Sequence, residues 1–261
     1  MEVHHHSSPA PGGTHTARKK WTHYFWEFLM LFLAVFCGFM AENQREHLVE
    51  HQREKQYIKS LLQDLKQDTM ELSWNIRSRE RRKISADSLI YELSFPISNE
   101  IQNRIYFNAN RLTSLAVFNY SNSTIQQLKN SGLMRLIRKS EVVNGINSYD
   151  LLVTRHKVRE DVELGLMNEF QKAICTVLDA ITVKTLGDSL NQAAFNPGTE
   201  SSGTKPVYKS LITKDPDKIN LVKGLTAQLS NRNLSNFYQL IQIRKEAVNI
   251  IGLIKKEYHM E

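Results

Sequence analysis

Residues 21–41 read WTHYFWEFLMLFLAVFCGFMA, an apolar run with one acid, Glu27, inside it. Each residue of an α-helix adds about 1.5 Å, so about eighteen residues span about 27 Å, close to the thickness of a bilayer's hydrocarbon core. Trp21, Tyr24 and Trp26 lie at one edge of the run, where their rings favour the headgroup layer. The stretch therefore predicts a transmembrane helix at residues 21–41.

A cleaved signal peptide is the main alternative, because a basic flank at residues 18–20 followed by an apolar run is also its pattern. The run from Phe25 to Met40 is long for the apolar part of a signal peptide, and no small-x-small cleavage site follows it. A lipoprotein site at Cys37 is disfavoured, since Phe36 stands where a small residue is expected. We therefore expect an uncleaved anchor.

Basic residues on both flanks bear on the orientation of the span. The triplet at 18–20 favours a cytoplasmic N-terminus and an exported C-terminal domain, because cytoplasmic flanks are enriched in Lys and Arg. Four basic residues beyond the other end oppose it, namely Arg45, Arg53, Lys55 and Lys59. We expect the N-terminus inside, because the triplet abuts the membrane boundary.

One face of the span has the pattern of a helix–helix contact. Glu27, Ala34 and Ala41 recur every seven residues with Gly38 beside them, and small residues let two helices approach closely. The residues predict self-association of the span into a homodimer, which would bring two Glu27 side chains together. The alternative for Glu27 is a carboxylate tolerated one turn inside the interface, near the positive end of the helix.

Residues 42–95 predict a long helix that continues from the span as a stalk, because the segment has neither Gly nor Pro. Six residues with spacings of three and four form a seam: Ile58, Leu62, Leu65, Thr69, Leu72 and Ile76. The seam suits a parallel coiled coil or a helix that packs into its own domain. We favour packing within the domain, because Lys55, Arg79 and Lys83 interrupt the seam.

Two charged clusters are interpreted as ordinary helix surface. Residues 77–83, RSRERRK, are the densest basic cluster, and we expect a solvated helix face there, with an acidic partner as the alternative. Glu160, Asp161 and Glu163 form an acidic patch, which we expect to lie in the first turn of a helix, where acids complement the helix dipole.

Residues 96–261 predict a helical bundle, because no segment alternates with period two. A helix is expected at about 99–115 after Phe95-Pro96, and a capping box at Ser123 and Gln126 opens a short helix that ends near Gly132. A helix from Asp150 to Leu186 is expected to face the core through a stripe of seven residues. They are Val158, Val162, Leu166, Phe170, Ile174, Val177 and Ile181.

The last part of the chain predicts a loop and then helix. Residues 187–214 are rich in Gly, Ser, Asn, Thr and Pro and suggest a long loop. Asp215-Pro216-Asp217 has a cap, a first-turn proline and a first-turn acid in the order of a helix start. A final helix at about 234–258 carries five apolar positions, namely Phe237, Ile241, Val248, Ile251 and Tyr258. The fold class is therefore all-α.

Composition excludes some function classes. The net charge of +7 is spread among many acids, so we expect no nucleic-acid binding, which needs a clustered basic footprint. Cys37 lies in the span and Cys175 far downstream, which predicts no intrachain disulfide. The tail at residues 1–20 is expected to be disordered. No phosphate-binding or dinucleotide motif is present, so we expect no cofactor, and the sequence identifies no small-molecule substrate.

The sequence His47-Leu48-Val49-Glu50-His51 matches H-x-x-E-H, the motif of inverted zinc peptidases. Two histidines four residues apart on a helix can share a metal, with Glu50 as the base. That chemistry also needs a third ligand and a closed cavity, whereas these residues lie on the most polar part of the chain. A solvated helix is the favoured interpretation, and a membrane-bound metal-dependent hydrolase is an alternative.

Two segments resemble an uncharacterised family of bacterial single-span membrane proteins. In residues 27–66 the matching positions are Glu27, Asn43, Glu46, Leu62 and Leu65. In residues 124–150 they are Leu128, Ser131, Gly132, Leu133 and Ile137. The segments cover about a quarter of the chain, and Gln44 departs from the tryptophan common in the family.

The resemblance implies an N-terminal transmembrane helix, a helical soluble domain and residence in a bacterial membrane, but no activity, because none is established for the family. With the charge pattern, this predicts a single-pass protein of the bacterial inner membrane with a periplasmic domain. The expected function is a non-enzymatic interaction or sensing domain that contacts the lipid bilayer and a protein partner. An accessory subunit of an envelope transport or signalling assembly is the further alternative.

Overall fold

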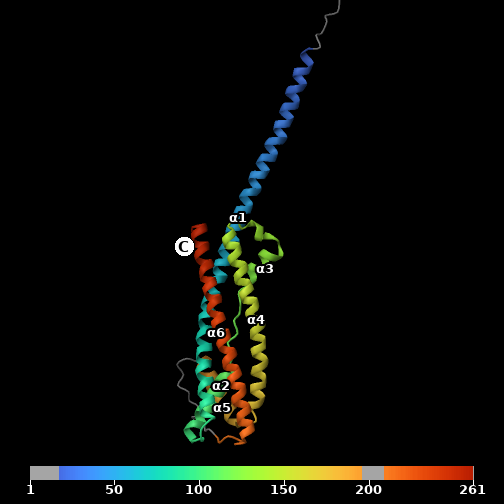
Figure 1. Ribbon diagram of the computed structural model, residues 1–261. Helices are drawn as coiled ribbons and strands as arrows, with labels where there is room; N and C mark the ends of the chain where they lie inside the picture. The colour runs from blue at the N-terminus through green and yellow to red at the C-terminus, as the bar shows by residue number, and fades with distance from the viewer. Residues whose placement is uncertain (1–17, 196–208, 261) are drawn as a thin grey trace, which may run out of the picture. The chain divides into compact units, whose positions relative to one another are not determined.

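The computed structural model describes residues 18–195 and 209–260, and side chains at 21–188 and 209–260 (Figure 1). Helices account for every regular element in these ranges, so the all-α prediction is confirmed. In chain order they are α1 (Arg18–Glu92), α2 (Asn99–Thr113), α3 (Ser123–Asn130), the 3₁₀ helix η1 (Leu133–Leu136), α4 (Ser140–Ile174), α5 (Ala180–Phe195) and α6 (Pro216–Tyr258). The predicted disordered tail lies outside the described residues up to position 17, and the prediction is wrong at residues 18–20, where α1 begins.

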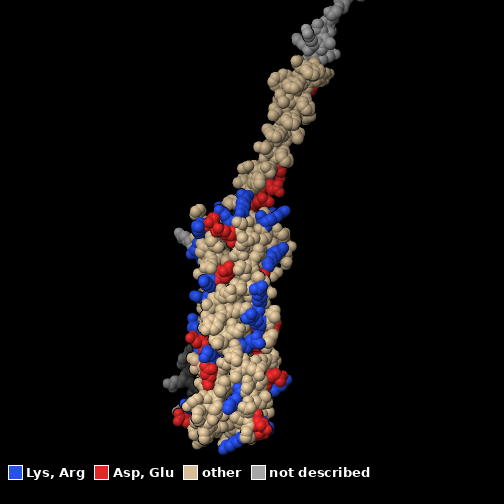
Figure 2. Space-filling model, viewed as in Figure 1, with Lys and Arg blue, Asp and Glu red and all other residues tan. Residues whose placement is uncertain are grey.

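The chain divides into two compact units, residues 1–53 and 54–261. In the first unit, α1 begins with an apolar stretch whose mean hydropathy reaches 1.9 over eighteen residues, and none of that stretch is buried in the fold. Figure 2 shows it almost free of charged side chains. Among the described residues this is one helix long and apolar enough to cross a membrane, a property that an N-terminal signal sequence shares.

Helix α1 continues without a break to Glu92, as the absence of Gly and Pro predicted, and it ends just before Phe95-Pro96. In the second unit its seam packs into the domain: Ile58, Leu65 and Leu72 are buried. The interpretation of the seam as packing within its own domain is therefore supported by burial. Fully burying one such aliphatic side chain contributes about 1.5–3 kcal/mol.

Two separate hydrophobic cores fill the second unit. The first core joins residues 58–72 of α1, 142–153 of α4 and 240–254 of α6. The second core joins residues 86–89 of α1 and the following Leu93, 167–174 of α4 and 222–229 of α6 with α2 and Leu186 of α5. The same three long helices therefore build both cores, and the buried face of each helix changes from apolar to polar between them.

The predicted helix at 150–186 is wrong in its bounds and partly in its face. Helix α4 begins ten residues earlier, at Ser140, and ends at Ile174, and a turn precedes α5. Phe170 is buried as predicted, but Val158 and Val162 are 63% and 53% exposed. The buried face carries polar residues at these levels, so a search for apolar periodicity selected the solvent side.

The predicted loop at 187–214 is wrong over 187–195, where α5 continues, and residues 196–208 lie outside the described chain. The predicted helix start is correct: the Asp215 carboxylate accepts the backbone N–H of Asp217 at 3.0 Å. One helix runs from there to Tyr258, so the predicted final helix is the second half of α6. Within it Ile241 and Val248 are 41% and 48% exposed, and Leu240 and Ala247 face the core instead.

The predicted capping box at Ser123 and Gln126 is wrong. Helix α3 starts at Ser123, and its N-terminus has no side-chain cap from its own sequence. The backbone N–H of Thr124 is instead accepted by Asp64 of α1 at 3.4 Å. The end of this helix is as predicted, since Gly132 has φ of +67°, a conformation that glycine adopts without strain.

Candidate functional site

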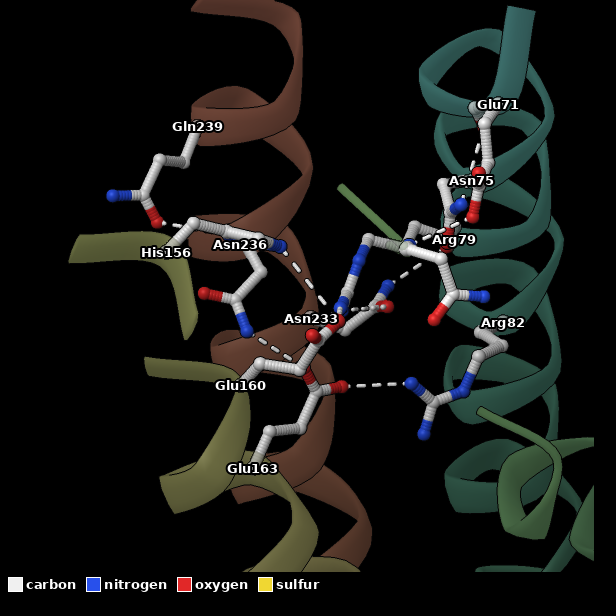
Figure 3. Close-up of polar contacts among 11 residues, drawn as sticks. Glu71, Asn75, Arg79, Arg82, His156, Glu160, Glu163, Asn233, Asn236 and Gln239 are labelled. Atoms are coloured by element: carbon white, nitrogen blue, oxygen red, sulfur yellow. Dashed lines mark hydrogen bonds and ion pairs between the residues drawn. The ribbon is translucent and has the colours of Figure 1, made fainter. Parts of the chain in front are cut away.

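A layer of buried polar side chains separates the two cores. We call it the polar layer, and it comprises Asn75, Arg79 and Arg82 of α1, His156, Glu160 and Glu163 of α4, and Asn233 and Asn236 of α6. Figure 3 shows the arginines and the glutamates directed toward one another across the bundle. Buried charges are rare unless they are paired, so a layer with four charged residues is the least ordinary part of this fold.

Glu163 is the centre of the polar layer. One of its oxygens accepts Arg79 Nη1 at 2.7 Å, and the other accepts Arg82 Nη1 at 2.7 Å. Asn236 Nδ2 donates a further bond of 2.6 Å to the same carboxylate. Arg82 also donates to the carbonyl of Leu112 at 3.0 Å, which ties α2 to the layer.

Glu160 extends the network. Arg79 Nη2 donates to its carboxylate at 3.2 Å, and His156 Nε2 lies 3.7 Å from the same oxygen. The other ring nitrogen of His156 lies 3.1 Å from the amide oxygen of Gln239. An amide oxygen only accepts, so this contact requires a proton on Nδ1 of His156.

Charges in the layer balance, with two guanidinium groups and two carboxylates. Burial acts to raise the pKa of Glu163, but the charges and hydrogen bonds of Arg79 and Arg82 outweigh it and hold this pKa below its ordinary value. Burial lowers the pKa of Arg82, and Glu163 offsets part of that effect. The network therefore keeps Glu163 ionised inside the protein.

The layer is not fully satisfied. Five of its buried side-chain atoms make no hydrogen bond with the described residues: Asn75 Oδ1, Arg79 Nε, Arg82 Nε, His156 Nε2 and Asn236 Oδ1. Most buried polar atoms in native proteins have a partner, and each exception costs about 1–3 kcal/mol. Stability alone does not account for such a layer.

Sequence reasoning missed this site. The solvated-face interpretation of residues 77–83 is wrong for Arg79 and Arg82, and Glu160 and Glu163 lie in the middle of α4 rather than in a first turn. One available signal was the interruption of the apolar seam at Arg79. The interruption at Lys83 differs, because Lys83 is partly exposed and pairs with Asp87 at 2.6 Å.

A second polar feature is a row of acids on α1 that bind backbone N–H groups of the connection between α2 and α4. We call these four residues the acid row. Glu54 accepts the N–H of Arg138 at 2.9 Å, Asp64 that of Thr124 at 3.4 Å, Asp68 that of Ser121 at 2.9 Å and Glu71 that of Asn119 at 2.7 Å. Three of these N–H groups lie outside α3 and η1, and that of Thr124 lies in the first turn of α3, so the row binds N–H groups that the helices of the connection leave unpaired.

Asp68 is the member of the acid row whose ionised form is destabilised by burial. Burial raises its pKa, although the hydroxyl of Tyr149 at 2.7 Å and the N–H of Ser121 oppose that effect. Burial and the neighbouring Asp68 raise the pKa of Tyr149 far above its ordinary value. A raised carboxyl pKa means that the folded state favours the protonated acid, so stability falls as the pH rises from the unfolded pKa through the folded one.

Asp68→Asn is therefore expected to stabilise the protein at pH 7 and to flatten its pH dependence between pH 4 and 7. The amide oxygen still accepts the N–H of Ser121, and the hydroxyl of Tyr149 can accept from the amide nitrogen. Urea unfolding followed by circular dichroism measures the effect. Asp87→Asn, at an exposed acid of the same helix, is the matched control, and an equal pH slope in all three proteins would contradict the role of Asp68.

The residues predicted for self-association of the span, Glu27, Ala34, Gly38 and Ala41, are all exposed in the single chain. No atom lies within 4 Å of a Cβ placed on Gly38. Close pairing of two spans through this face stays a prediction. The position of Cys37, three residues after Ala34, places a thiol near the same face.

In native membranes under oxidising conditions, the Cys175→Ser protein is expected to form a dimer linked through Cys37. Gly38→Leu should reduce the dimer severalfold, because the larger side chain fits the single helix but blocks close approach. Moving the thiol to the far face with Cys37→Ser and Phe36→Cys is the control. Non-reducing electrophoresis measures the dimer, and its absence from the Cys175→Ser protein would rule out a close seam.

The H-x-x-E-H residues belong to the first unit. His47 is exposed, and Glu50 and His51 are half-buried. No group of three or more His, Cys, Asp or Glu residues in the described ranges is arranged to hold a metal ion. Any metal would need a ligand from outside this group.

The fold and the site together define a class: an all-α protein with one candidate membrane-spanning helix and a helical domain divided by a buried charged layer. Searches against family models, curated proteins and solved structures return no match. The resemblance to the bacterial single-span family therefore stays a prediction.

Proposed function

We propose that this chain is a single-pass protein of the bacterial inner membrane whose periplasmic helical domain is a non-enzymatic interaction or sensing module. The observation that carries the proposal is the polar layer between two apolar cores. A domain selected for stability alone would have one continuous core at this position. The layer instead favours a domain whose packing responds to a partner or a condition.

The energetics of buried ion pairs support this role. Desolvating two arginines and two glutamates offsets most of their mutual attraction, so such networks contribute little net stability. They are sensitive to displacement, because moving one member leaves its partner as an uncompensated buried charge. A partner that shifts α4 or α6 relative to α1 would therefore select between distinct packings.

Support for the tether comes from the span and its flank. Apolar side chains that no part of the fold covers need another apolar environment, and the bilayer supplies one. The basic triplet at residues 18–20 favours the orientation with the domain exported. The same helix would then connect the bilayer to the polar layer, because Arg79 and Arg82 also belong to α1.

The location part of the proposal is tested with reporter fusions. Alkaline phosphatase at the C-terminus should be active and green fluorescent protein dark, and the intact protein should resist carbonate extraction. The opposite reporter pattern would overturn the periplasmic assignment. Recovery of a soluble chain that starts after residue 41 would overturn the anchor itself.

The interaction part is tested by photocrosslinking in living cells. A photoreactive residue is placed at exposed positions of α4, for example Val158, in the native protein and in a variant with an apolar layer. A discrete adduct that only the native layer supports would favour a responsive domain. Adducts that are equal in both proteins, or absent from every position, would contradict the proposal of a responsive domain. Stoichiometric co-purification of a transporter would instead favour an accessory subunit.

A further inference from the structure

A cavity of about 460 Å³ lies where α2, the end of α4 and the start of α5 meet, and none of its lining residues belongs to the polar layer. Figure 1 places the labels of α2 and α5 together at that end of the domain. Most of the lining is apolar, with Ala109, Ile174, Leu178, Ala180 and Val183. The volume falls within the range of about 300–1,000 Å³ typical of small-molecule sites.

The walls of the cavity are held by hydrogen bonds. Tyr106 is buried, and its hydroxyl accepts the backbone N–H of Asp179 at 2.8 Å. The carboxylate of Asp179 accepts both the N–H and the hydroxyl of Thr182, each at 2.9 Å. These bonds fix the turn between α4 and α5 against α2. The cavity is therefore preformed, which reduces the cost of binding.

Polar groups in the lining indicate the chemistry of a ligand. Asn110 and Gln171 are half-buried, and neither side chain makes a hydrogen bond with another described residue. The one charged lining residue is Lys184, which pairs with Asp188 at 2.7 Å. A ligand therefore meets apolar walls and two free amides, with no unpaired charge to neutralise.

We propose that this cavity binds a small, uncharged and largely apolar molecule that carries one hydrogen-bonding group, such as a primary amide or an alcohol. The apolar body fills the space between α2 and α5, and the polar group bonds to Asn110 and Gln171. This site is independent of the proposed membrane function, because every residue that forms it lies in the second unit. Cys175 also lines the cavity and serves as a reporter.

The test uses the full chain in lipid nanodiscs with Cys37→Ser, so that Cys175 is its one thiol. Decanamide is the probe, and the charged reagent dithiobisnitrobenzoate labels the thiol. The labelling rate is expected to fall saturably, by about tenfold at ten times the Kd if the bound form is unreactive. The midpoint of thermal unfolding should rise over the same concentration range.

Two phenylalanine substitutions separate the cavity from the lipid. Ala109→Phe fills the cavity, and neither readout of this protein should respond to decanamide. Val158→Phe, on the exposed face of α4, should respond as the parent does. Val183→Phe, at a partly exposed lining position, gives the same test if Ala109→Phe fails to fold.

Two results would overturn the proposal. One is a labelling rate and an unfolding midpoint that are unchanged by decanamide up to its solubility limit. The other is an equal response in the parent and in the cavity-filling proteins, which would assign the effect to the bilayer.

Discussion

Glu163→Gln is expected to lower the free energy of unfolding by about 3–5 kcal/mol, the usual cost of removing one member of a buried ion pair. The glutamine has nearly the same volume, so the loss comes from charge and not from a cavity. Arg79 would keep Glu160 as its carboxylate partner, whereas Arg82 would remain buried with only the carbonyl of Leu112. Denaturant unfolding of the full chain in nanodiscs measures the change.

Glu169→Gln is the matched control for this prediction. Glu169 lies on the same helix and pairs with Lys172 at 2.8 Å, but both side chains are exposed. An exposed pair of this kind contributes within about 1 kcal/mol. The lowered pKa of Glu163 adds a signature, since its stabilisation is present above the unfolded pKa and is lost as the pH falls through the folded pKa. Equal losses in the two variants would refute a central role for Glu163.

Replacing the four charged residues of the layer together with Asn236 is expected to have the opposite effect. Such a variant combines five substitutions: Arg79→Met, Arg82→Met, Glu160→Leu, Glu163→Leu and Asn236→Leu. It should be as stable as the parent or more stable, by up to about 4 kcal/mol, because apolar side chains avoid the desolvation cost. Comparison with Glu163→Gln distinguishes two changes in the free energy of unfolding. One is the loss when a single charge of the network is removed, and the other is the net difference between the charged network and an apolar replacement.

Thermal and denaturant unfolding measure this second prediction. Asn233 stays in the variant because its amide bonds to the carbonyl of Arg79 at 2.8 Å and not only to its side chain. A variant that unfolds as easily as Glu163→Gln would show that the native network is a net stabiliser, and the argument for a responsive layer would lose its basis. A stable variant that loses its crosslinked partner would link the layer to function.

Local patterns were enough to predict the helices with clear end signals. Asp215-Pro216-Asp217 begins α6, Phe95-Pro96 follows the end of α1, and Gly132 adopts the left-handed conformation expected of it. Each of these signals determines the backbone conformation only of residues next to it in the sequence. These helix ends could therefore be predicted from the residues at the ends themselves.

The polar layer could not be predicted in the same way. Arg79 and Arg82 meet Glu163 across 84 and 81 residues of chain. The interrupted seam marks Arg79, but nothing local distinguishes Arg82 from Arg77 or Arg81 or identifies Glu163 as the partner. The same layer explains the errors in the stripe on α4. With polar residues on its buried side and Val158 outside, the apolar period indicates the wrong face.

The acid row has a consequence for how this protein can vary. Its carboxylates accept hydrogen bonds from main-chain N–H groups, which every residue except proline provides. These hydrogen bonds therefore do not depend on which side chain the donor residue carries. Substitutions other than proline at Asn119, Ser121 or Arg138 keep these hydrogen bonds, whereas Thr124 is buried and is also constrained by packing. Sequence variation is therefore more readily tolerated in the connection between α2 and α4 than at the acid row of α1, whose carboxylates bind it.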